Sequence, residues 1–103
     1  MYKLNYYVPV DAKEKTKQAL FNIGVGMFDN YDSCSWETLG VGQFKPVGNA
    51  NPAIGELHKL ETLQEYKIEL ICPDSLIQEA VRTLKEAHPY EEVAYEVFKM
   101  EDF

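Results

Sequence analysis

The sequence is short of basic residues and of cysteine. Its ten lysines and arginines are outnumbered by seventeen aspartates and glutamates, which gives a formal net charge of −7. Nucleic-acid binding requires clustered positive charge, and the only basic run is the helix-like "KEKTK", so we expect no nucleic-acid partner. The two cysteines, Cys34 and Cys72, form no CxxC motif, which argues against a disulfide scaffold or a zinc ribbon and predicts reduced thiols.

Long apolar runs are also missing. The N-terminal "MYKLNYYVPV" alternates polar and apolar residues, and it contains neither the apolar segment of a signal peptide nor the roughly 20 apolar residues of a membrane span. We therefore expect a cytoplasmic protein without membrane association. With 103 residues, of which 46% are hydrophobic, the chain has the size and composition of a single globular domain, residues 1–103.

The apolar residues that are present follow the periods of strands and of half-buried helices. The strands are expected at residues 2–9, 34–45, 65–73 and 92–100, and the helices at residues 11–23 and 74–87. This βαββαβ order is typical of an α+β ferredoxin-like sandwich, in which two helices cover one face of an antiparallel sheet. The intervening segment 46–60 is rich in turn residues and is expected to be the most mobile part of the chain outside its termini.

Several residues predict where the helices begin and end. Asp11 stands three positions before Glu14, which predicts a capping box, and Asp74 is expected to cap the second helix. His88 precedes a proline and should end that helix. The motifs "IGVGMF" and "LGVGQF" lack the third glycine of a dinucleotide-binding loop, so we interpret Gly24 as a helix end and the second motif as a β-bulge.

The stretch "AHPYEEVAYEVF" gathers side chains that often bind ligands. Glu91 and Glu92 are adjacent in the expected strand, so they should point to opposite faces and cannot form a close acid–base pair. A place at the helix end would explain His88 structurally. The alternative is a divalent-metal site, for which His58, His88 and Glu91 are the candidate ligands.

Cys34, in "NYDSCSW", shows no general base nearby in the sequence. A pair with one of the two histidines would be needed for nucleophilic catalysis, and a semi-buried structural thiol is the simpler interpretation. No complete catalytic constellation is visible, so we expect no enzyme activity and no cofactor.

The last expected strand is apolar on both faces. One face carries Val93, Tyr95 and Val97, and the other carries Ala94, Phe98 and Met100. Because the helices cover only one face of such a sheet, a second copy of the chain is the simplest cover for the other, which predicts a homo-oligomer.

Five motifs occur in order: "NYDSCSW", "GVGQFKP", "NPAIGE", "YKIELICP" and "AHPYEEVAYEVF". On these the chain, from about Tyr2 to Met100, resembles the PII-like or CutA-like insert domain of Nif-three-like (YqfO-type) dinuclear-metal proteins, here standing alone. The resemblance implies a ferredoxin-like fold, assembly as a trimer or dimer, and no established reaction. It does not imply the dinuclear site, because the parts that carry that site are absent.

The candidate ligand-binding or interface residues lie in the first and last of these motifs: Asn30, Tyr31, Cys34, Trp36, His88, Tyr90, Glu91 and Glu92. The chain departs from the pattern at Val93, where proline is frequent, and at Asp29 and His58, where glycine is expected. Together these observations favour a self-associating, non-enzymatic binding or regulatory module for a small molecule or ion. The alternative is a divalent-metal-binding protein of the CutA type.

Overall fold

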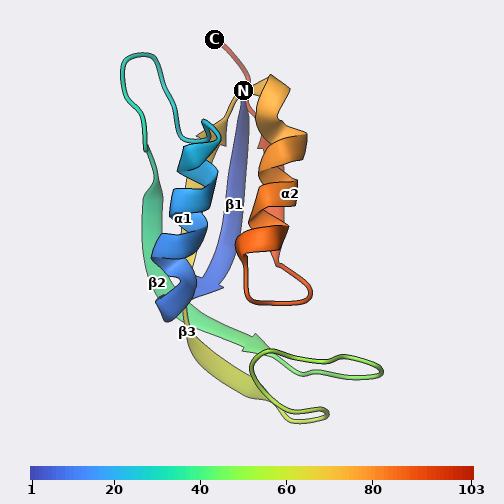
Figure 1. Ribbon diagram of the computed structural model, residues 1–103. Coiled ribbons are helices and arrows are strands. Elements are labelled where there is room, and N and C mark those ends of the chain that lie inside the picture. The colour runs from blue at the N-terminus through green and yellow to red at the C-terminus, as the bar shows by residue number, and fades with distance from the viewer.

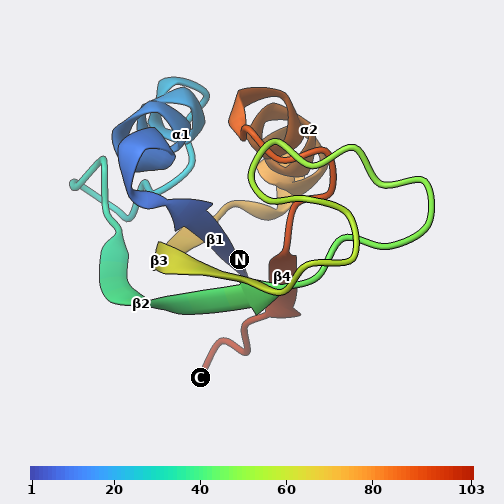
Figure 2. The same ribbon diagram turned by 90° about the horizontal axis from the view of Figure 1, so that it is seen from below.

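The computed structural model describes residues 1–103, and its element order is βαββαβ. The strands are β1 (Tyr2–Pro9), β2 (Trp36–Phe44), β3 (Glu61–Cys72) and β4 (Tyr95–Lys99), and the helices are α1 (Lys13–Asn22) and α2 (Ile77–Ala87). The strands form one antiparallel sheet in the order β2-β3-β1-β4, with both helices on the same face (Figure 2). This is the predicted ferredoxin-like sandwich.

The core lies between the helices and the central strands. Alternate residues of β1 and β3 face it, as their period-two patterns predict, and α1 and α2 cover them. The largest of its fully buried apolar side chains are Leu4, Tyr6, Leu20, Ile68, Leu70 and Leu84. Each such side chain contributes about 1.5–3 kcal/mol when it leaves water, so this layer supplies most of the stability.

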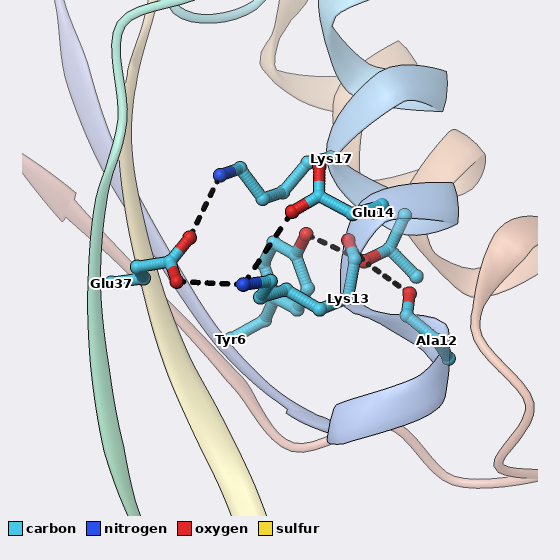
Figure 3. A network of polar contacts seen from close by, with 7 residues as sticks. Tyr6, Ala12, Lys13, Glu14, Lys17 and Glu37 are labelled. Atoms are coloured by element: carbon cyan, nitrogen blue, oxygen red, sulfur yellow. Dashed lines mark hydrogen bonds and ion pairs between the residues drawn. The ribbon is translucent and has the colours of Figure 1, made fainter.

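Polar contacts fix helix α1 against the sheet (Figure 3). The hydroxyl group of Tyr6 donates a hydrogen bond to Oγ1 of Thr16 at 2.8 Å inside the core. Lys13 and Lys17 both donate to the carboxylate of Glu37 on β2, at 2.8 and 2.9 Å. These bonds lower the pKa of Glu37, led by the one from Lys13, so the carboxylate stays charged and holds the first turns of α1 over β2.

The predicted starts of both helices are wrong. A short 3₁₀ turn, Val10–Ala12, precedes α1, and neither it nor α1 has a side-chain cap at its N-terminus. A second 3₁₀ turn, Asp74–Leu76, precedes α2, and the Asp74 carboxylate pairs with the N-terminal amine instead of capping. That amine carries a full charge, which attracts the carboxylate more strongly than the dipole of a peptide N–H. The predicted helix ends are confirmed, with His88 extended (ψ 140°) after α2 and Gly24 at φ +102° after α1.

Strand β2 contains no bulge, contrary to the interpretation of its glycines. Its register with β3 runs without interruption from Trp36 opposite Glu69 to Phe44 opposite Glu61. Strand β3 therefore begins four residues earlier than predicted, and the two strands extend beyond β1 as an arm, residues 41–64, whose tip is the loop 45–60 (Figure 1). The sequence did not indicate this extension, because the apolar alternation of residues 65–72 does not continue through residues 61–64, which are mostly polar.

Strand β4 begins three residues later than predicted, at Tyr95. Residues 88–94 instead form a corner between α2 and β4, so the argument that placed Glu91 and Glu92 on opposite strand faces does not apply. Val93 and Tyr95 pack against the core, while Phe98 and Met100 are 54% and 41% exposed in the single chain. Neither helix has the length and apolarity needed to cross a membrane.

Candidate functional site

A groove of about 520 Å³ lies between the arm and the corner. Much of its apolar lining comes from the arm, namely Val41, Phe44, Pro46, Val47, Pro52 and Ile54. Three carboxylates also line it, those of Glu65, Glu91 and Glu92, against one lysine, Lys45. Its volume falls in the range of small-molecule sites, and it combines apolar walls with a few polar groups as such sites do.

A hydrogen bond joins the two walls of the groove. The hydroxyl group of Tyr90, in the corner, donates to Oε2 of Glu65, in β3, at 2.9 Å. Gly42 makes room for this carboxylate, because a side-chain Cβ at that position would overlap Oε1 of Glu65. The ring of Tyr90 also lies against that of Phe44, with centroids 6.0 Å apart. Burial raises the pKa of Tyr90, and the bond to Glu65 raises it further, so the phenol stays protonated as a donor.

His88 stabilises the corner through contacts with two backbone groups. It is 5% exposed, and its Nε2 lies 2.7 Å from the carbonyl oxygen of Tyr7, while its Nδ1 accepts the backbone N–H of Tyr90 at 3.1 Å. Since Nδ1 is an acceptor, Nε2 carries the proton and donates to Tyr7. Burial lowers the pKa of His88, opposed by the Tyr7 hydrogen bond and by the nearby Glu65 carboxylate, and the imidazole is neutral.

Glu91 connects the corner to the loop of the arm. Its Oε1 accepts a hydrogen bond from the backbone N–H of Asn51 at 2.9 Å. Glu91 therefore holds the backbone of the arm loop against the corner. The Glu92 side chain makes no hydrogen bond within the chain and is exposed, so its charge faces the groove and solvent.

The structure divides the sequence-predicted site residues into two groups. His88, Tyr90, Glu91 and Glu92 lie at the corner, whereas Asn30, Tyr31, Cys34 and Trp36 lie in or just after the loop that follows α1. Figure 1 shows that loop at the opposite end of the molecule from the arm. Tyr31 and Trp36 are 72% and 69% exposed there. The thiol of Cys34 lies 3.8 Å from the carbonyl oxygen of Asp32, so the structure shows no Cys–His pair.

The candidate metal ligands do not come together. No group of three or more His, Cys, Asp or Glu side chains is placed to hold a metal ion, so His58, His88 and Glu91 form no such site. Both ring nitrogens of His88 already have backbone partners. The second cysteine, Cys72, is buried in the core, and burial raises the pKa of its thiol to about 11.

Sequence reasoning missed most of the groove lining, including its polar residues Glu65 and Tyr7. Glu65 occupies a polar position of an alternating strand, where a solvent-facing carboxylate is the ordinary interpretation. Its hydrogen-bond partner, Tyr90, lies 25 positions away in the sequence. Only the register of β3 against β2, which sets Glu65 diagonally across from Gly42, identifies it.

Comparison with known proteins relates the chain to part of larger proteins. No family model matches it. It is 38% identical over 99 residues, 96% of its own length, to the GTP cyclohydrolase 1 type 2 homolog of Bacillus subtilis. The chain covers only 26% of that protein, and so spans about a quarter of the curated relatives that it matches.

Solved structures agree with this relationship. A Bacillus cereus protein related to NIF3 superposes on 98% of the chain with a TM-score of 0.82 and 36% identity, and the match covers 26% of that protein. Pyrococcus horikoshii CutA, crystallised in the presence of guanidine hydrochloride, superposes on the whole chain with a TM-score of 0.73 at 18% identity, over 87% of its own length. The predicted resemblance is thus confirmed: the chain matches one portion of NIF3-related proteins and has a CutA-like, PII-like fold.

Proposed function

We propose that this CutA-like relative of one portion of the NIF3-related proteins is a self-associating binding module. It takes a small molecule or ion in the groove between arm and corner, and it regulates through that binding without catalysing a reaction. The proposal does not extend to the activity of the longer relatives, because the chain spans about a quarter of their length.

The observation that carries the binding proposal is the contact between Tyr90 and Glu65 over Gly42. The Glu65 carboxylate lies against Gly42 and accepts a hydrogen bond from the phenol of Tyr90. It is therefore a polar group with a defined position among apolar lining side chains. The hydrogen bond from Tyr90 to Glu65 and the one from Asn51 to Glu91 connect the two walls, which lowers the entropic cost of ordering them on binding.

Self-association is supported by the edge strand β2. None of the backbone hydrogen bonds outside the helices and strands involves residues 36–44, so the outer N–H and C=O groups of β2 have no partner in the chain. Leu39 and Val41 on this strand are 50% and 76% exposed. An edge of nine residues with exposed apolar side chains and no lysine or proline is a template for pairing with another chain. We propose that a second copy covers it, in a dimer or trimer.

Native mass spectrometry tests both parts of the proposal, with protein purified without added metal and without a metal-binding tag. We expect a mass two or three times that of the chain and, where a ligand is retained, extra mass that collision releases. A monomer at micromolar concentration would refute self-association. Stoichiometric zinc or copper would support the divalent-metal alternative instead.

A further inference from the structure

We propose that the groove between arm and corner recognises an organic cation, a protonated amine attached to an apolar body. This inference rests on the proposed binding function and adds the chemical class of the ligand.

The charges of the groove favour a cation. Glu65, Glu91 and Glu92 line it, against Lys45 alone. Asp11 and Glu61 lie close enough to raise the pKa of Tyr90 through their charge, so the negative potential extends beyond the lining itself. An anionic ligand would meet repulsion from each of these carboxylates.

The acceptors inside the groove are only partly used. One oxygen of Glu65 accepts the Tyr90 hydroxyl group, while Oε1, against Gly42, has no hydrogen-bond donor within the chain. Glu92 likewise has none. An ammonium group carries three donors and no acceptor, so it complements these free carboxylate oxygens.

The walls beside these oxygens are aromatic and aliphatic. The rings of Phe44 and Tyr90 are tilted against each other next to Glu65. Ring faces attract a nearby ammonium group, and the prolines and aliphatic side chains of the arm provide a surface for an apolar body. A bare divalent ion would use the carboxylates but not these walls, and the carboxylates do not gather into a group of three.

Three ligands of matched size test the inference: benzylamine, which is cationic, benzyl alcohol, which is neutral, and benzoate, which is anionic. Binding to the intact chain is followed by the shifts of its backbone amide NMR signals. We expect benzylamine to shift the amides of Gly42 and Tyr90, and to bind at least about tenfold more tightly than the alcohol, as a charge-assisted hydrogen bond predicts. Benzoate should not bind.

Two variants locate the cation. Glu65→Gln should weaken benzylamine binding about tenfold, and Glu92→Gln, which removes an exposed carboxylate without a hydrogen bond, should weaken it by a smaller factor. Glu69→Gln is the matched control, because it removes the same charge from β3 at an ion pair with Lys3 outside the groove, and it should leave the affinity unchanged.

Each outcome decides a different point. Equal or tighter binding of benzyl alcohol or benzoate at the groove would overturn the cation proposal while leaving the groove as a binding site. If magnesium or zinc ions displaced benzylamine stoichiometrically, the site would be one for metal ions. If none of the three ligands shifted groove amides at millimolar concentration, the cation proposal would fail.

Discussion

Replacing His88 with asparagine should destabilise the domain strongly near neutral pH. The imidazole is buried and joins two backbone segments, because it donates to the carbonyl of Tyr7 and accepts the N–H of Tyr90. The shorter asparagine cannot reach both. Each buried backbone group left without a partner costs roughly 1–3 kcal/mol, so we expect a loss of about 2–4 kcal/mol in the free energy of unfolding.

The pH dependence gives this prediction a second and sharper test. Burial lowers the pKa of folded His88, so the unfolded chain takes up its proton more readily than the folded one. Stability contributed by the neutral imidazole is therefore fully present above the unfolded pKa, about 6.5, and is lost as the pH falls through that value toward the folded pKa. The difference between wild type and variant should be largest at about pH 7.5 and should shrink at about pH 5.5.

Urea denaturation at the two pH values measures this difference. The other histidine provides the control, since His58 is exposed and asparagine tolerates its left-handed backbone (φ +63°). His58→Asn should change stability little. A cost below about 1 kcal/mol for His88→Asn, or a cost that does not depend on pH, would refute the supporting role of His88.

Three further perturbations test the arm, the groove and the edge strand. Glu91→Ala removes the bond to the loop of the arm, so amide hydrogen exchange in residues 46–60, already expected to be faster than in β3, should accelerate about fivefold for a bond of about 1 kcal/mol. Gly42→Ala should displace the Glu65 carboxylate, costing about 1 kcal/mol in a thermal melt and abolishing amine binding. Leu39→Lys places a charge on the β2 edge and should reduce the mass seen by light scattering to that of a monomer.

Each of these variants has a matched control in the chain. Glu92→Ala removes a neighbouring carboxylate that makes no hydrogen bond and should leave loop exchange unchanged. Gly40→Ala adds a methyl group with no atom within 4 Å and should leave the Glu65 carboxylate in place. Leu57→Lys adds the same charge to an exposed loop position and should leave the oligomer intact. If a control matched its test variant, the corresponding argument would be wrong.

The parts of the fold that could be predicted are those governed by local periodicity. Strand β1 was predicted with its observed bounds, because its alternation is uninterrupted and Pro9 ends it. The end of α2 followed from the restriction that Pro89 places on His88. The start of α2 was not predictable in this way, since the Asp74 carboxylate pairs with the N-terminal amine, 73 residues away in the sequence, and no local pattern indicates that contact.

The site shows the same division between local and distant information. The corner residues were identified because proline, histidine and two glutamates are concentrated in a short stretch. Their chemical partners come from elsewhere: Tyr7 lies 81 residues from His88, and Asn51 lies 40 residues from Glu91. Residues that are adjacent only in space leave no mark in a single sequence, so Glu65 could be found only after the strands were paired.

The register of β2 against β3 connects the arm, the groove and the proposed ligand. Glu65 stands opposite Gly40 and diagonal to Gly42, so the carboxylate lies over a strand position that has no side chain. A slip of one residue would move Glu65 to the other face of the ladder, because side chains alternate along a strand. The tip of the arm is a loop, and an insertion there would change the entropy of loop closure only weakly. An insertion within the paired strands would instead move the Glu65 carboxylate out of the groove. The chemistry of the groove is thus set by strand pairing far more than by the loop that encloses it.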